Sequence, residues 1–165
     1  MCGRFILSAC ATALAKQFGL ADLPVWTPHS NIAPTQEVLA VVKPLDTSER
    51  HAHLLRWGLI SMWAEGLTMG SRIINARAET VVTKPASRRA FRGRRRIILK
   101  DGFYEWWRQR RWKQPFCICH RDGSPFAFAR LWEQWKRDHR SWRSRIERGW
   151  EEARWKARRR SWNSR

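Results

Sequence analysis

Residues 37–43 read E-V-L-A-V-V-K, five apolar residues between two charged ones, and Pro44 follows directly. The β-branched valines favour the extended backbone of a strand, whereas proline has no N–H to offer to a sheet. The stretch therefore predicts a β-strand that ends before Pro44.

Further runs of this kind lie later in the chain. Residues 54–60 and 96–99 predict two more strands. Residues 115–119 (P-F-C-I-C) alternate, residues 120–125 (H-R-D-G-S-P) contain an Asp-Gly turn, and residues 126–129 are again apolar. Two such runs around Asp-Gly are typical of a β-hairpin, so these segments are predicted to pair with each other.

Two segments have the spacing of a helix instead. Within residues 8–19 apolar side chains recur every three or four positions, and Gly19 is a typical helix end. Residues 84–91 predict a second short helix. Residues 1–136 are thus predicted to form one globular unit.

The chain has 165 residues, of which 43% are apolar, enough for one domain with a hydrophobic core. No segment approaches the ~20 apolar residues of a membrane span, and the first residues lack the pattern of a secretory signal. We therefore expect a soluble cytoplasmic protein, nucleoid-associated if bacterial, that has no membrane partner and keeps its four cysteines reduced.

The charge balance is extreme, because 33 Lys and Arg against 14 Asp and Glu give a net charge of +19. A field of that sign attracts polyanions, of which nucleic acid is the commonest in a cell. Twelve tryptophans add flat faces on which bases can stack. Residues 137–165 hold eleven cationic and four acidic residues, and they predict a basic Arg/Trp-rich tail, partly helical or disordered, after a domain at residues 1–136.

The chain begins M-C-G-R-F, with Cys2 directly after the initiator methionine. If Met1 is removed, Cys2 carries a free α-amine and a thiol on neighbouring carbons. The amine can form a Schiff base with an aldehyde, and the thiol can then close onto the imine carbon as a five-membered thiazolidine. Taken alone, Cys2 fits a small buried residue in a first strand better. Arg4 adds a cation that suits a phosphate.

Two internal clusters suit the same chemistry. Residues 75–79 read N-A-R-A-E, in which Asn75 can hold an amine or a carbonyl and Arg77 would share its face in an extended chain. Residues 101–106 read D-G-F-Y-E-W, and aromatic neighbours around Glu105 would form an apolar wall that suits a carboxyl group to proton transfer. The plainer interpretations stay open: a capping asparagine, a surface arginine and a solvated glutamate in a turn.

No metal or cofactor site is predicted. Cys117, Cys119 and His120 resemble half of a metal site, but the sequence has no second pair of ligands at a suitable spacing. It also has no glycine-rich phosphate loop and no nucleophile elbow of the hydrolase type.

Six motifs occur in a fixed order: M-C-G-R-F (1–5), N-I-A-P-T-Q (31–36), R-W-G-L-I (56–60), I-N-A-R-A-E-T (74–80), D-G-F-Y-E-W (101–106) and K-Q-P-F (113–116). In this combination the sequence resembles, from residue 1 to about residue 136, the SRAP family, the SOS-response-associated peptidase domain. The resemblance implies a single compact α+β domain of curved, mostly antiparallel β-sheets with a few short helices. We expect a monomer.

The resemblance also implies a function. Family members bind single-stranded DNA at abasic sites and crosslink to the ring-opened sugar as a thiazolidine, which protects the lesion in the DNA damage response. By motif, Cys2 resembles the crosslinking nucleophile, Asn75 the residue that holds its amine, and Glu105 the acid/base group. The family's glutamate also takes part in removing Met1 by autoproteolysis, so peptidase and lyase-type chemistry is implied without a cofactor. The residues that resemble the family's DNA contacts are Arg4, Asn31 and Arg77.

The sequence departs from the family pattern near its end. Leu131, Trp132 and Glu133 match the family, but Arg130 stands where a glycine is usual, and no H-D-R-M-P motif follows. The histidine of that motif assists Schiff-base formation in the family, and His139 does not match it. We therefore expect a truncated or frameshifted copy of the domain that crosslinks more weakly or more slowly, with a nonfunctional fragment as the alternative.

Two other functions fit part of the sequence. An N-terminal-nucleophile amidohydrolase also begins Met-Cys-Gly, but it leaves both internal clusters and the basic charge unexplained. It would hydrolyse glutamine without crosslinking DNA. A non-catalytic nucleic-acid-binding module would use the charge and the tryptophans, and its binding would not depend on Cys2.

Overall fold

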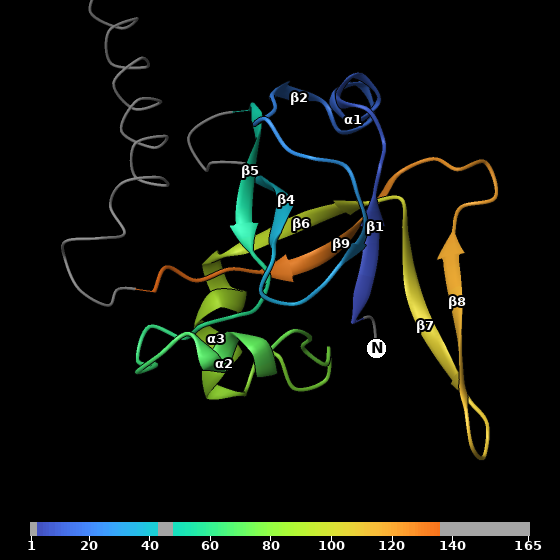
Figure 1. Cartoon of the computed structure of the whole chain (residues 1–165). Helices are drawn as coiled ribbons and strands as arrows, with labels where there is room; N and C mark the ends of the chain where they lie inside the picture. The colour runs from blue at the N-terminus through green and yellow to red at the C-terminus, as the bar shows by residue number, and fades with distance from the viewer. Residues whose placement is uncertain (1–2, 43–47, 136–165) are drawn as a thin grey trace, which may run out of the picture. The chain divides into compact units, whose positions relative to one another are not determined.

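The structure, a computed structural model, describes residues 3–42 and 48–135 (Figure 1). Cys2, Pro44 and the predicted basic tail at residues 137–165 lie outside the described residues. The domain boundary at residue 136 stays a prediction.

Strands dominate the described residues and short helices interrupt them. In chain order the elements are β1 (Arg4–Leu7), α1 (Ala11–Phe18), β2 (Leu20–Asp22), β3 (His29–Ile32), β4 (Glu37–Val42), β5 (Arg50–Arg56), α2 (Thr68–Arg72), α3 (Pro85–Gly93), β6 (Arg95–Lys100), β7 (Gly102–Arg108), β8 (Lys113–Cys119) and β9 (Phe126–Leu131).

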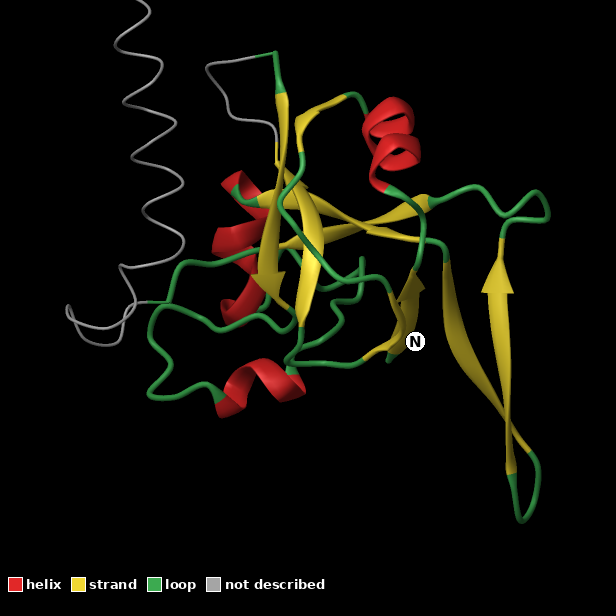
Figure 2. Cartoon of the chain, turned by 45° about the horizontal axis from the view of Figure 1, so that its top comes forward, coloured by secondary structure: helices red, strands yellow, loops and turns green. Residues whose placement is uncertain are grey.

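The strands form two sheets (Figure 2). The four-stranded sheet has the order β3-β1-β7-β8, and the five-stranded sheet has the order β2-β5-β4-β6-β9. All of the pairings are antiparallel except that of β2 with β5. This confirms the α+β class with mostly antiparallel sheets.

The strand predicted from residues 37–43 is β4, and it lies inside the five-stranded sheet between β5 and β6. All five residues from Val38 to Val42 are buried, so both faces of the strand are covered. A strand buried on both faces reads as a continuous apolar run rather than an alternating one. The main core cluster joins β4 to Phe5 and Leu7 of β1, and the Phe5 ring packs 5.0 Å from that of Trp57.

The other local predictions have mixed outcomes. The helix predicted in residues 8–19 is α1, and Gly19 ends it in the left-handed conformation at φ 61°. Residues 84–91 and 96–99 correspond to α3 and β6. The strand predicted over residues 54–60 is wrong in its bounds. It runs only from Arg50 to Arg56, and the backbone soon leaves the extended conformation, since Gly58 has a φ of 129°.

The hairpin predicted around Asp-Gly is wrong in its pairing. β8 pairs with β7, whereas β9 pairs with β6 in the other sheet. The turn itself forms: Gly123 has φ 70° and its N–H bonds the His120 carbonyl. It joins two sheets instead of two neighbours, because the rings of β9, such as Phe128, pack in the core against Phe103. Every residue of β8, by contrast, is exposed.

Gly58 holds the segment after β5 against α2, and its replacement by alanine is expected to destabilise the fold strongly. Its φ is +129°, and an added Cβ would lie 2.1 Å from the Gly70 carbonyl oxygen. The backbone on both sides would have to shift, so we expect Gly58→Ala to lower the free energy of unfolding by about 3 kcal/mol or more. Thermal unfolding followed by circular dichroism measures the change.

Gly93→Ala is the matched control for this prediction. Gly93 ends α3, has no positive φ, and no atom lies within 4 Å of an added Cβ. We expect its effect to stay within about 0.5 kcal/mol. Equal melting temperatures for the two variants would contradict the assigned role of Gly58.

Candidate functional site

Three of the predicted site residues, Arg4, Asn31 and Glu105, lie around the start of β1, the strand that follows Cys2. Cys2 itself lies outside the described residues. Arg4 begins β1, and its Nη1 donates a hydrogen bond of 3.1 Å to Oδ1 of Asn31 in β3. The two predicted DNA contacts are 27 residues apart in sequence and meet because β1 and β3 are neighbours in the sheet.

Glu105 lies on β7, the other neighbour of β1. The register pairs Arg4 with Tyr104 and Phe5 with Phe103, so Glu105 follows directly after the residue opposite Arg4. Since side chains alternate along a strand, Glu105 shares the face of Phe5 and Phe103, and Arg4 shares that of Tyr104. The start of β1 therefore lies between an Arg4–Asn31 pair on one face of the sheet and a carboxyl group on the other.

The apolar wall predicted around Glu105 forms only on one side. Phe103 and Trp107 share the face of Glu105, and Phe116 of β8 stands directly opposite it. Tyr104 and Trp106 belong to the other face, where the Tyr104 hydroxyl donates to the Ser30 carbonyl at 3.1 Å. Glu105 is half-buried in a strand, so the alternative of a solvated glutamate in a turn is wrong.

Asn75 lies in the loop after α2 and is held from β9. Its Oδ1 accepts a hydrogen bond of 3.1 Å from Nη1 of Arg130, which also donates to the Ile74 carbonyl. The Arg130 guanidinium lies 5.5 Å from the centre of the Trp57 ring, and the Trp57 indole N–H donates to the same Ile74 carbonyl at 3.3 Å. Because Trp57 packs on Phe5, a continuous set of contacts joins Asn75 to β1, on the face that also carries Glu105.

Arg77 does not join these contacts. It is exposed, whereas Asn75 is half-buried, and residues 73–77 form a loop instead of a strand. The shared face predicted for the two residues therefore rested on an extended segment that does not form. Within the described part of the chain, Arg77 makes no hydrogen bond or ion pair with a side chain.

Two residues of this region were not predicted as site residues. Trp57 belongs to the R-W-G-L-I motif, and its burial could have been expected from its size and apolar neighbours. The only signal of Arg130 in the sequence was that it replaces the glycine usual in the family. Its contact with Asn75, 55 residues away in sequence, depends on the position of β9 beside β6.

Neither a metal site nor a membrane span is found in the part of the chain that the structure describes. No group of three or more His, Cys, Asp or Glu side chains there could hold a metal ion. No helix among the described residues is long and apolar enough to cross a membrane.

Comparison with known proteins identifies the family of the chain. The family model described as SOS response associated peptidase (SRAP) matches residues 1–148. The chain is 41% identical over 139 residues to the abasic site processing protein YoaM of Bacillus subtilis, covering 82% of this chain and 60% of that protein. It is 32% identical over 140 residues to the abasic site processing protein YedK of Escherichia coli, covering 79% of this chain and 59% of that one.

A solved structure shows the same fold. An X-ray structure of a Bordetella bronchiseptica protein superposes with a TM-score of 0.67 and 26% sequence identity, over 82% of this chain and 65% of that one. The chain thus spans about three fifths of the length of the curated relatives it matches.

Proposed function

The chain belongs to the SOS response associated peptidase (SRAP) family, and from that premise we propose that it captures abasic sites in single-stranded DNA through a covalent bond to Cys2. Its relatives YoaM and YedK bear the name abasic site processing protein. The observation that carries the proposal is the pairing of β1 with β7, which brings the start of β1, the strand that follows Cys2 in sequence, beside Glu105. The captured lesion would be shielded from strand cleavage.

The proposed reaction needs the α-amine and the thiol of one residue. After Met1 is removed, the Cys2 amine attacks the aldehyde carbon of the ring-opened sugar, and the aldehyde oxygen leaves as water to form a C=N bond. The thiol sulfur then adds to the same carbon while its proton passes to the nitrogen. A thiazolidine and one water result, and no oxidant or reductant is consumed.

The described side chains suit the separate needs of this reaction. Arg4 can bind a phosphate of the strand, and Asn31 orients its guanidinium from β3. Arg77 is exposed and could contact a second phosphate. Glu105 is the carboxyl group that would move protons during loss of water, and Asn75 would hold the amine or the oxygen of the adduct. Removal of Met1 is proposed to use the same glutamate.

The function is tested with abasic single-stranded DNA. Purified protein is incubated with an oligonucleotide that carries one abasic site, and heat-stable shifted bands are compared with those of an undamaged strand. We expect a band only with the abasic strand, and intact mass should show loss of Met1. An unprocessed N-terminus with no band would reject the proposal, since a blocked amine cannot form a thiazolidine.

Arg130 is expected to assist the reaction by fixing the Asn75 amide. Nη1 of Arg130 donates to Oδ1 of Asn75, so the amide nitrogen of Asn75 points away from Arg130. Loss of one hydrogen bond to a charged group should slow formation of the covalent band about tenfold in Arg130→Met, with little change in reversible DNA affinity. Arg130→Lys should recover part of the rate. A loss of affinity at an unchanged rate would instead indicate that Arg130 contacts DNA.

A further inference from the structure

The hairpin formed by β7 and β8 extends away from the rest of the described fold (Figure 1). β7 pairs with β1 and β8, whereas β8 lies at the edge of the sheet and, among the strands that the structure describes, pairs with β7 alone. All seven residues of β8 are exposed. The hairpin therefore offers a surface that the described core does not use.

Aromatic rings gather on this hairpin. The Trp107 ring lies 6.4 Å from the ring of Trp112 and 6.4 Å from that of Phe116. These three residues, the aromatic triad, are 57%, 50% and 50% exposed. Large apolar rings at such exposure are unusual on a surface without a partner. Trp107 and Phe116 are also on the face of β7 and β8 that carries Glu105.

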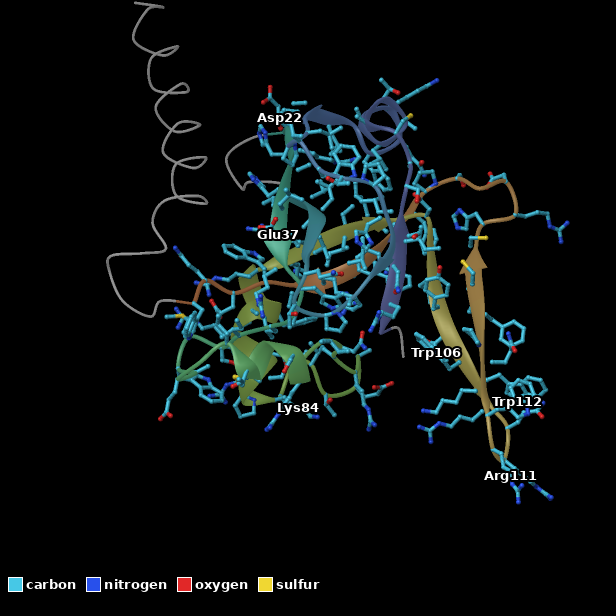
Figure 3. All side chains as sticks on the ribbon, viewed as in Figure 1. Asp22, Glu37, Lys84, Trp106, Arg111 and Trp112 are labelled. Carbon is cyan, nitrogen blue, oxygen red and sulfur yellow. The ribbon has the colours of Figure 1, made fainter. Side chains whose placement is uncertain are left out.

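The tip of the same hairpin carries four cations: Arg108, Arg110, Arg111 and Lys113. Figure 3 shows Arg111 at the tip of the hairpin, Trp112 above it and Trp106 further from the tip. Among the residues that the structure describes, none of the four cationic side chains forms a hydrogen bond or an ion pair. No acidic residue stands between Glu105 and Asp122 to neutralise them.

We propose that the aromatic triad and the four cations bind the undamaged single strand next to the captured lesion, an inference that rests on the proposed function. Unpaired bases stack on exposed aromatic rings while cations follow the phosphates. A duplex would not offer its base faces, and a second copy of this chain, with its net charge of +19, would be repelled. The part of the hairpin between Glu105 and the tip is about 15 Å long, which is the length of about four stacked nucleotides of single-stranded DNA.

The proposal is tested by the affinity for undamaged DNA as a function of salt. Fluorescence anisotropy of labelled dT15 compares the wild-type chain with Trp107→Ala/Trp112→Ala and with Arg110→Gln/Arg111→Gln. We expect the aromatic variant to bind at least about tenfold more weakly with an unchanged salt slope. In the charge variant the slope of log K against log salt, which is negative, should become shallower by about 1.4.

The matched control, Arg88→Gln/Arg89→Gln, neutralises two exposed cations of α3. It should change the affinity for dT15 and the salt slope much less than the hairpin variants do. If this control lost as much affinity for dT15 as Arg110→Gln/Arg111→Gln, binding would depend on the overall positive charge of the protein, and the proposal would be overturned. Wild-type affinity for dT15 in the aromatic variant would also overturn the proposal. The surface would then recognise charge alone, which would fit an acidic protein partner instead of unpaired bases. The melting temperature of each variant checks that the fold is intact.

The crosslinking reaction separates this surface from the proposed function. With an abasic trinucleotide, too short to reach the tip, the Arg110→Gln/Arg111→Gln variant should form the covalent band at the wild-type rate, and with an abasic 15-mer it should be slower at low DNA concentration. If no band forms but the variants lose affinity for dT15, the proposed function fails and the hairpin surface stands. If bands form and the variants bind dT15 normally, the proposed function stands and the DNA-binding role of the hairpin is rejected.

Discussion

Cys2→Ala is expected to abolish the heat-stable band with abasic single-stranded DNA while leaving reversible binding within about twofold. The alanine keeps the α-amine, so a Schiff base can still form, but no thiol remains to close the ring. The imine hydrolyses on heating, and the loss of the stable band should be complete. Gel analysis after denaturation measures the covalent product, and anisotropy at low temperature measures binding.

Cys10→Ala is the control for this experiment. Cys10 is exposed, and a contact of 3.2 Å from its sulfur to the Thr12 hydroxyl holds the pKa of its thiol below the usual value. Its thiol therefore ionises more readily than an ordinary cysteine thiol, yet it has no neighbouring α-amine. We expect Cys10→Ala to form the band as the wild type does. A band that depended on Cys10 would indicate a simple thiol adduct and would reject the thiazolidine.

Glu105→Gln is expected to slow formation of the covalent band by about 10²-fold or more at saturating DNA. Glutamine keeps the size and the hydrogen-bonding reach of the side chain but cannot give or take a proton in the loss of water. The effect should appear in the rate and not in the affinity, because the substitution removes proton transfer but keeps the shape of the side chain. Single-turnover crosslinking at several DNA concentrations separates the two quantities.

Glu37→Gln serves as the matched control for this change. Glu37 is exposed at the start of β4, in the other sheet, and its replacement removes the same charge. We expect its rate to match the wild type. Equal slowing in the two variants would show that net charge and not proton transfer matters. Intact mass shows whether the Glu105→Gln variant still carries Met1. This check separates lost proton transfer from a blocked amine, since both prevent the reaction.

The strands and helices that were predicted have local signals, whereas β2, β3, β7 and α2 were not predicted. The apolar run of β4 and the spacing of α1 with its terminal Gly19 follow from backbone preference and burial within a few residues. The pairing of β8 was not predictable in this way. An Asp-Gly turn permits a hairpin, but the packing of Phe126 and Phe128 against Phe103 commits β9 to the sheet of β6.

The sequence alone determined the family, the α+β class and the residues that could carry the chemistry, since these depend on residue types in a fixed order. Only the tertiary structure decided which of them meet. Arg4 reaches Asn31 and stands beside the strand of Glu105 because β1 lies between β3 and β7. Arg130 holds Asn75 because β9 lies beside β6. Contacts between residues far apart in sequence depend on which strands share a sheet, and that choice is made by burying side chains from the whole chain at once.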